Sequence, residues 1–340
     1  PAGCHLELDA VASKIVLDNI RDAVPARWSA RVEELRQLAR DGEPVSLARY
    51  LDETGVELTD VYAGTRSWSD LRADAGLSVA SAGPEEVVFR RACGRLLHVD
   101  DHERIDTYRR LLASASPPTV TDLGERERRL LRMLVASVAD SALAKGTDLE
   151  AASALVWSHP EVVTELRELL DVLAGRIDHV HAPLTSRPDV PLQVHARYSR
   201  IEILAAFGVG EDAKVAPWQT GVYWAKTARA DLLAFTLDKT SGQFSPTTRY
   251  RDYALSRELI HWESQSATRA ASPTGERYQQ HVQQRSDIML FARLRADDRA
   301  FWFLGPASYV KHESELPMAV TWRLEHLLPG DLYAAFRAAV

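Results

Sequence analysis

Residues 288–304 have the sequence IMLFARLRADDRAFWFL, and this stretch decides the fold of the C-terminal half. Apart from Arg293, the residues of 288–293 and 300–304 are apolar or aromatic, while residues 295–299 are polar except for one alanine. Two such runs around a short polar connection predict two paired antiparallel strands. The stretch therefore predicts a β-hairpin.

The flanking sequence extends this sheet. Residues 220–226 and 231–237 form a second pair of apolar and aromatic runs, and residues 318–324 predict a further strand. Residues 200–207 instead predict a helix. We therefore expect an α+β protein whose C-terminal part, residues 190–340, is a mixed domain. Its sheet should be strongly bent, mostly antiparallel and closing toward a small barrel, comparable to SRA and PUA-like domains.

The N-terminal half is predicted to be helical. Apolar residues recur at helical spacing near its C-terminal end, at Val162, Leu166, Leu169, Leu170 and Leu173. Residues 182–191 contain three prolines, which suit an extended connection and mark the domain boundary. We expect a helical connector over residues 26–185. Within it, residues 46–77 predict short helices joined by Gly55 and Gly64, which suit either a small helix-turn-helix module or a helical spacer.

Composition limits the class of protein. With 340 residues, 46% hydrophobic and 26% charged, the chain is predicted to form about two domains. Its two cysteines, Cys4 and Cys93, exclude a disulfide framework or a four-cysteine zinc site. No apolar run approaches the roughly 18 residues of a membrane span, and no signal peptide is recognisable. We expect a cytoplasmic protein without a membrane partner, and the start at Pro1 suggests a fragment or a processed chain.

Charge is distributed unevenly. The whole chain has a net charge of −7, but residues 191–340 hold 18 Lys and Arg against 16 Asp and Glu, a net of +2. A nearly neutral domain can still bind DNA through a local basic patch, with modest and salt-dependent affinity. The acidic character of the chain lies in its N-terminal half.

Residues 246–265, PTTRYRDYALSRELIHWESQ, combine basic, aromatic and amide side chains without a clear apolar stripe. Proteins that bind nucleic acids use cations for phosphates, aromatic faces for bases, and amides or carboxylates for base edges. The stretch therefore predicts a recognition surface. The alternative for Trp262 and one of the tyrosines is that they are ordinary core residues of a strand pair.

Several segments in order resemble one known family. They are YSRIEILAAF (198–207), WQTGVYWA (218–225), FWFLGPASY (301–309) and HESELPMAVTW (312–322), together with the stretch above. They resemble the C-terminal domain of unknown function in SauUSI-type restriction enzymes, which are ATP-dependent and modification-dependent (type IV) endonucleases. Residues 1–25 are similar to the tail of the second RecA-like helicase lobe of those enzymes. The resemblance implies recognition of 5-methylcytosine or 5-hydroxymethylcytosine in double-stranded DNA. It also implies helicase and phospholipase-D-like nuclease domains in the same polypeptide, with ATP and Mg²⁺ as cofactors of the full-length enzyme.

A 5-methyl group in the major groove offers only about 0.8 kcal/mol of apolar contact. Extruding the base adds aromatic stacking of roughly 1–3 kcal/mol and hydrogen bonds to its edge. We therefore expect base flipping. The candidate pocket walls are Tyr223, Trp224, Tyr253 and Trp262, and the candidate readers of the base edge are Asp252, Glu263 and Gln265. The candidate phosphate contacts are Lys226, Arg249, Arg251 and Lys311.

No motif predicts catalysis or a cofactor site in this chain. A phosphate-binding loop, the nuclease element of phospholipase D and an H-E-x-x-H zinc motif are all missing from the sequence. The HVDDHE segment at 98–103 holds potential metal ligands, but an exposed polar turn is the favoured interpretation. Carboxylates near His261 lack a nucleophile. A second hypothesis is a protein-docking module with Trp218, Trp224 and Trp302 as anchors. A third is an unrecognised nuclease.

Overall fold

The computed structural model describes residues 27–339, apart from 41, 82, 141, 143–145, 211–217, 219 and 238–251. The segment similar to a helicase lobe, residues 1–25, lies outside the described residues. The chain divides into two compact units. The first runs to Gly94 and includes His159–Leu169, and the second comprises Arg95–Ser158 and Leu170 onward. The boundaries that we placed from the sequence stay predictions.

The first unit is helical. Its helices within the described residues include α2 (Leu47–Thr54), α3 (Leu58–Val61), α4 (Trp68–Asp74), α5 (Glu86–Cys93) and the beginning of α10 (Pro160–Ala174). Gly55 and Gly64 adopt positive φ angles of 69° and 68° between the short helices, which is the left-handed conformation that glycine adopts without strain. The predicted series of short helices joined by these glycines is confirmed.

Glu165, on α10, is buried beside the first turn of α4. Its carboxylate oxygens accept the backbone N–H groups of Trp68 at 3.1 Å and Ser69 at 3.0 Å. Burial raises the pKa of the Glu165 carboxyl from about 4.5 to about 7, because removal from water disfavours the charged form. The backbone N–H groups lower the pKa and offset part of this shift.

The raised pKa of Glu165 predicts a pH dependence of stability. The folded state keeps this proton where the unfolded chain has released it, so stability from this group is greatest below pH 4.5 and falls as pH rises to about 7. The difference should be about 3 kcal/mol. Urea unfolding of the full chain at pH 5 and pH 8 measures it. Glu165→Gln, which cannot ionise, should lack this component, and a pH dependence identical to that of the wild type would contradict the assignment.

The second unit contains helices and a sheet. The helices and 3₁₀ turns include η1 (Gly94–Leu96), α6 (His102–Leu112), η2 (Val120–Asp122), α7 (Glu125–Val138), α9 (Leu149–Trp157), the end of α10, α11 (Arg200–Ala206), α12 (Pro273–Gln279) and α13 (Gly330–Ala338). The helix predicted at 200–207 is confirmed by α11. The apolar stripe of α10 is buried, as its helical spacing predicted.

A buried ion network joins the start of α6 to α11. Arg104 contacts Asp101 and donates to Glu202 at 2.9 Å, and His98 Nε2 lies 2.5 Å from the same Glu202 carboxylate. All four side chains are buried. The expectation that residues 98–103 form an exposed polar turn is therefore wrong, because a carboxylate more than 90 residues away pairs with this segment.

The strands of the main sheet follow the order β4-β5-β8-β9-β10-β7-β6, with β3 also pairing with β9. Their bounds are β3 (Arg197–Ser199), β4 (Val222–Ala225), β5 (Ala230–Thr236), β6 (Tyr253–Ala254), β7 (Leu259–Glu263), β8 (Asp287–Arg293), β9 (Ala300–Glu313) and β10 (Ala319–Leu324). Both predicted hairpins and the strand at 318–324 are confirmed. The pair β5–β8 is parallel and the other pairs are antiparallel. A separate two-stranded sheet pairs β1 (Ala182–Pro183) with β2 (Gln193–Val194).

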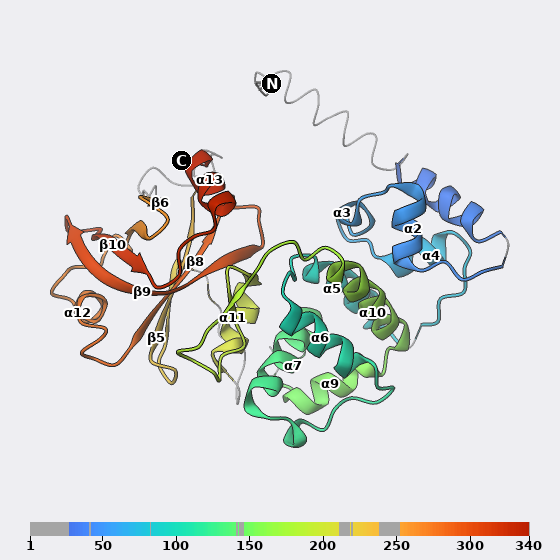
Figure 1. The fold of residues 1–340 in the computed structure, drawn as a ribbon. Helices are drawn as coiled ribbons and strands as arrows, with labels where there is room; N and C mark the ends of the chain where they lie inside the picture. The colour runs from blue at the N-terminus through green and yellow to red at the C-terminus, as the bar shows by residue number, and fades with distance from the viewer. Residues whose placement is uncertain are drawn as a thin grey trace, which may run out of the picture. The chain divides into compact units, whose positions relative to one another are not determined.

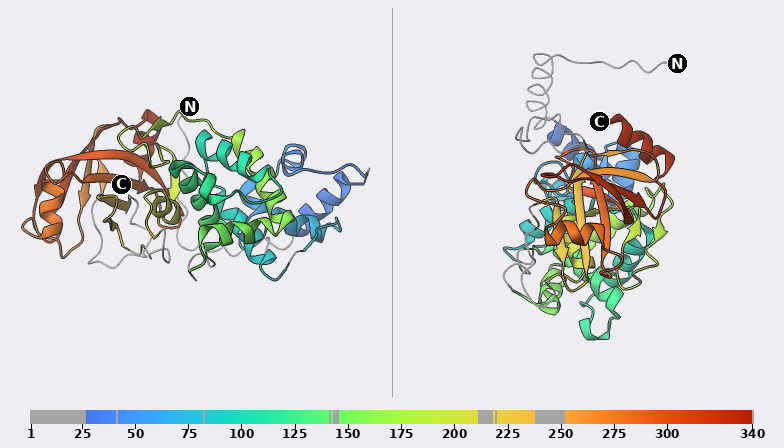
Figure 2. Two further views of the ribbon diagram at one scale, coloured as in Figure 1. Left: turned by 90° about the horizontal axis from the view of Figure 1, so that it is seen from below. Right: turned by 90° about the vertical axis from the view of Figure 1, so that its left-hand side faces the viewer.

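Strand β9 connects the two halves of the sheet and bends it (Figures 1 and 2). Its beginning pairs with β3 and β8, and its end pairs with β10. The pairing shifts register near Leu290 and again between Thr321 and Trp322, and such irregularities bend a strand. At the corner Gly305 has φ 95°, and an added Cβ would lie 3.2 Å from Val194. The expected α+β class and bent sheet are confirmed, and the strand order within the described residues is an open path from β4 to β6.

A hydrophobic core fills one face of the sheet. It includes Trp262 of β7, Trp322 of β10, Tyr278 of α12 and Phe336 of α13, which are all buried. The Trp262 ring lies 5.7 Å from Tyr278 and 6.2 Å from Trp322. In the described part of the chain, no helix has both the length and the apolarity that crossing a membrane requires.

Candidate functional site

The predicted recognition stretch divides between the two faces of β6 and β7. Trp262 is only 3% exposed and points into the core, whereas its neighbours His261 and Glu263 point to the opposite face and are half-buried. This follows from the alternation of side chains along a strand. Tyr253 lies opposite His261 in the β6–β7 pair, and their rings stack 4.6 Å apart. Trp262 is therefore a core residue of the strand pair, which is the alternative that we considered for it.

The face opposite the core carries further polar side chains from neighbouring strands. Thr321 of β10 pairs with His261 on one side and with Lys311 of β9 on the other. We call Tyr253, His261, Glu263, Thr321 and Lys311 the outer face. Burial lowers the pKa of the His261 imidazole, and the neighbouring carboxylate of Glu263 partly offsets this effect. The fold thus brings three of the predicted residues, Tyr253, Glu263 and Lys311, onto one side of adjacent strands.

Two other predicted readers of the base edge occupy different environments. Asp252 is 4% exposed, and its carboxylate accepts the backbone N–H of Glu263 at 2.9 Å. This contact joins the residue before β6 to the end of β7. Gln265 is exposed beyond the end of β7.

The predicted pocket walls on β4 lie at the other end of the strand order. Trp224 is covered by the guanidinium of Arg277, whose carbon lies 4.2 Å from the ring centroid. Arg277 is held by two hydrogen bonds to the buried carboxylate of Asp231, at 2.6 and 2.8 Å. Tyr223 lies 6.0 Å from the ring of Trp218.

Two of the four predicted phosphate contacts lie within the described residues. Lys226 is exposed in the turn between β4 and β5. Lys311 is also exposed, and its ammonium lies 2.6 Å from the carboxylate of Glu313. Arg249 and Arg251 lie outside the described residues. The two lysines are therefore placed on the surface, where they are accessible to a phosphate backbone.

The three tryptophans that we considered as docking anchors offer little open surface. Trp218 is only 7% exposed. Trp224 is half-buried under Arg277, and Trp302 is half-buried beside Phe336, with ring centroids 6.0 Å apart.

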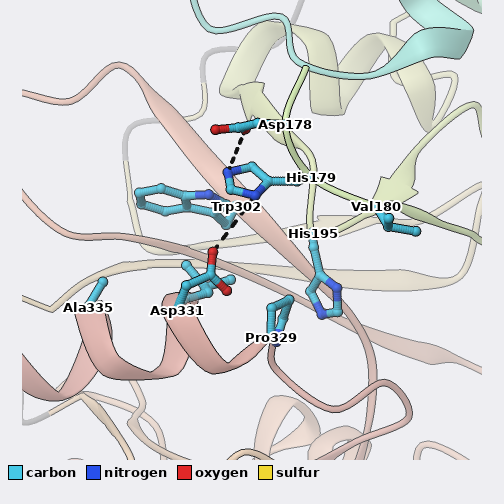
Figure 3. Close-up of a pocket in the computed structure, with 9 residues that line it drawn as sticks. Asp178, His179, Val180, His195, Trp302, Pro329, Asp331 and Ala335 are labelled. Carbon is cyan, nitrogen blue, oxygen red and sulfur yellow. Dashed lines mark ion pairs between the residues drawn. The ribbon is translucent and has the colours of Figure 1, made fainter. Parts of the chain in front are cut away.

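A cavity of about 440 Å³ lies beside α13 (Figure 3). Its lining comprises Asp178, His179, Val180, His195, Trp302, Pro329, Asp331, Leu332 and Ala335. Figure 3 shows the His179 ring between two carboxylates, with Nε2 3.1 Å from Asp178 and Nδ1 3.8 Å from Asp331. Trp302 supplies an aromatic wall, and its other contacts are the ring of Phe336 and the guanidinium of Arg197 at 4.8 Å.

His195 is fixed in this cavity by its backbone. Its φ of 74° is unusual for a residue other than glycine, and its N–H donates to the Phe303 carbonyl at 2.6 Å. Burial, with a smaller effect of the nearby His326, lowers the pKa of the His195 imidazole to about 4, so the ring is neutral at neutral pH. Its buried Nε2 has no hydrogen-bond partner among the described residues. Such an atom is available to a ligand.

The cavity combines the groups that bind a planar heterocycle carrying an amino group. The indole of Trp302 offers a stacking surface, the neutral imidazole of His195 offers a hydrogen bond, and the carboxylate of Asp331 accepts from an amine. Sequence reasoning missed His179, His195 and Asp331, and considered Trp302 only as a docking anchor. No local pattern marks them, because Trp302 and Asp331 lie more than 100 residues after the two histidines in the sequence. Among the described residues, no group of His, Cys, Asp and Glu is arranged to hold a metal ion.

Comparison with known families identifies the domain that holds the outer face and most of this cavity. Residues 192–336 match the family described as Domain of unknown function (DUF3427). This domain is found in helicase-associated C-terminal regions of restriction-type proteins. The match covers less than half of the chain and supports a domain of unknown function, not the SauUSI type as such. No curated protein matches the chain.

Proposed function

We propose that residues 192–336 bind double-stranded DNA and recognise 5-methylcytosine or 5-hydroxymethylcytosine as part of a type IV restriction enzyme. The matched domain and the sequence resemblance support this context. In this proposal, ATP hydrolysis and cleavage belong to helicase and phospholipase-D-like domains of the same polypeptide, which is cytoplasmic. The bent sheet would be related to the small barrels of SRA and PUA-like proteins.

The observation that carries the proposal is the cavity beside α13. A flipped pyrimidine is flat and carries an exocyclic amine, and it would stack on Trp302 while its amine donates to Asp331. His195 Nε2, which lacks a partner among the described residues, would bond to the base edge. Stacking contributes roughly 1–3 kcal/mol, which offsets an unstacking cost of a few kcal/mol. The cavity volume of about 440 Å³ lies within the usual range for small-ligand sites.

The outer face supplies a second set of contacts in this proposal. Its stacked Tyr253 and His261 rings, the Glu263 carboxylate and Lys311 would lie along the duplex next to the extruded base. Lys226 and Lys311 are exposed and would contact phosphates. These contacts fix the register of the protein on DNA and are independent of the modification.

The full chain is expected to bind a duplex with 5-methylcytosine more tightly than the same unmodified duplex. Asp331→Asn and His195→Asn should each weaken binding of the modified duplex by roughly 10- to 100-fold, because the first replaces a charged acceptor with a weaker neutral one and the second removes the imidazole Nε2 that bonds to the base edge. Asparagine suits position 195, where φ is positive. Fluorescence anisotropy with methylated, hydroxymethylated and unmodified duplexes measures the effect.

The matched control is Glu325→Gln, which neutralises an exposed carboxylate outside the cavity lining and should leave both affinities unchanged. Equal affinities of the wild-type chain for modified and unmodified duplexes, across a salt titration, would refute base recognition. That result would favour the protein-docking hypothesis.

A further inference from the structure

We infer that Arg200 and Arg293 form a binding site for a phosphate group of the DNA backbone, an inference that rests on the proposed function. Arg200 is the first residue of α11, and Arg293 is the last residue of β8. Their guanidinium carbons lie 5.4 and 4.7 Å from the centroid of the same ring, that of Phe301. Arg200 also lies 5.6 Å from the ring of Trp218. Two cations thus share one aromatic ring.

Both guanidinium groups have neutral partners. Arg200 donates to the carbonyl oxygen of Trp218 at 3.3 Å, and its buried Nε has no hydrogen-bond partner among the described residues. Arg293 donates to Thr236 Oγ1 at 2.9 Å and to the carbonyl oxygen of Asp298 at 2.5 Å. The nearby Asp298 carboxylate instead accepts two hydrogen bonds from Arg197, at 2.8 and 2.7 Å.

Two other half-buried arginines of the same unit pair with acids. Arg277 lies 2.6 Å from the Asp231 carboxylate, and Arg187 contacts Asp287. For Arg200 and Arg293, no carboxylate of the described residues lies within 4 Å. Burial lowers the pKa of both groups; Arg293 lowers that of Arg200 further, whereas the more distant carboxylates of Asp298 and Asp297 partly offset the shift at Arg293. Removing unpaired like charges from water is unfavourable, so this pair is arranged to accept an anion.

The chemistry of the site suits a phosphate. A guanidinium presents a planar set of donors that matches phosphate oxygens, and the buried indole N–H of Trp218, which lacks a partner among the described residues, adds a further donor. Cations interleaved with aromatic rings are typical of surfaces that bind a nucleic-acid strand. This arrangement favours a phosphodiester of bound DNA over a free anion.

Arg200→Met and Arg293→Met test the inference in the full chain. Each variant should weaken binding to the methylated and unmodified duplexes alike, by about three- to tenfold near 100 mM salt. Each should also reduce the slope of log affinity against log salt by about one unit, because one phosphate contact is lost. Arg200→Lys keeps the charge without the planar donors, so it should weaken binding while retaining the slope.

The matched control is Arg295→Met. This exposed arginine in the nearby β8–β9 turn pairs with Asp297 at 2.9 Å, and its loss should leave the salt slope unchanged.

Circular dichroism checks that the variants fold. If the methionine variants do not fold, the Arg200→Lys variant decides: wild-type affinity of this variant for DNA would overturn the inference. Wild-type slopes in both folded methionine variants also overturn it and leave base recognition intact. If the wild-type chain shows no preference for modified DNA, base recognition is refuted. A reduced salt slope of the arginine variants on unmodified DNA would still support the arginine site. A chain that binds no duplex refutes both.

Inorganic phosphate separates the two sources of the anion. At equal ionic strength, phosphate should displace DNA from the wild-type chain more effectively than chloride does, and this difference should disappear in Arg200→Met. If calorimetry shows that phosphate binds to the wild-type chain, and phosphate nevertheless does not displace DNA, the site binds a free anion. That result would overturn the assignment to the DNA backbone.

Discussion

Glu202→Gln is expected to lower the free energy of unfolding of the second unit by about 3–5 kcal/mol. Glu202 is fully buried. Its carboxylate receives hydrogen bonds from Arg104 at 2.9 Å and from the backbone and hydroxyl of Ser199 at 2.8 and 2.7 Å, and it lies 2.5 Å from His98. Neutralising Glu202 leaves the buried Arg104 with fewer compensating charges. Removing one partner of a buried ion pair is strongly destabilising, because the remaining charge stays out of water without compensation.

The pKa of Glu202 supports this expectation. Burial alone would raise it, but the charges of His98 and Arg104 and the hydrogen bonds to the carboxylate lower it to about 2. A lowered carboxyl pKa means that this stabilisation is present above about pH 4.5 and is lost as pH falls toward 2. Glu202→Gln should therefore reduce stability most at neutral pH and least in acid.

Urea unfolding followed by circular dichroism at pH 7 measures the loss. The control is Glu258→Gln, which removes a carboxylate that is 48% exposed and 3.3 Å from Arg323. Surface pairs of this kind contribute about 0–1 kcal/mol. A loss of less than about 1 kcal/mol in Glu202→Gln would show that the network is not a main source of stability.

Trp262→Ala is expected to destabilise the sheet by about 3–5 kcal/mol, because truncating a buried tryptophan removes its packing and leaves a cavity. Its ring contacts Tyr278 and Trp322 inside the core. Tyr253→Ala, on the outer face of the adjacent strand, should cost about 1 kcal/mol or less. The two variants thus alter opposite faces of the sheet.

Thermal and urea unfolding of both variants provide the measurement. Trp262→Phe, which keeps an apolar ring, should retain much of the stability and allow DNA binding to be compared with the wild type. If Trp262→Ala kept wild-type stability and lost only discrimination between modified and unmodified DNA, the tryptophan would be a wall of the base pocket, as the sequence suggested.

Most local elements could be predicted from the sequence. Runs of apolar residues around short polar connections predicted the β8–β9 and β4–β5 hairpins, and β10 and α11 were also placed within a few residues. Periodicity depends on neighbours in the chain, so it is visible without an alignment. It did not predict the 14-residue length of β9, because its second half is mostly polar or exposed and pairs with a strand that follows it.

The candidate site was predicted in part. Tyr253, Glu263 and Lys311 do gather on the outer face, since β10 brings β7 beside β9. Strand alternation separates Trp262 from them, and a sequence rich in aromatic residues does not reveal which ring faces the core. The burial of His98 and Asp101 was misjudged for a similar reason, since Glu202, which pairs with His98, lies on another helix.

The sequence alone indicates where most helices and strands form and which residues are apolar enough to build a core, and it is the basis of the prediction that the C-terminal domain binds nucleic acid. The cavity beside α13, and the position of Arg200 and Arg293 at the ring of Phe301, follow only from the tertiary structure. Both depend on contacts between segments that are far apart in the chain, at 178–195, 302 and 331 for the cavity and at 200, 293 and 301 for the arginine pair. The neutral state of His195 and the lowered pKa of Arg200 both arise from burial, which occurs only when these segments exclude water together.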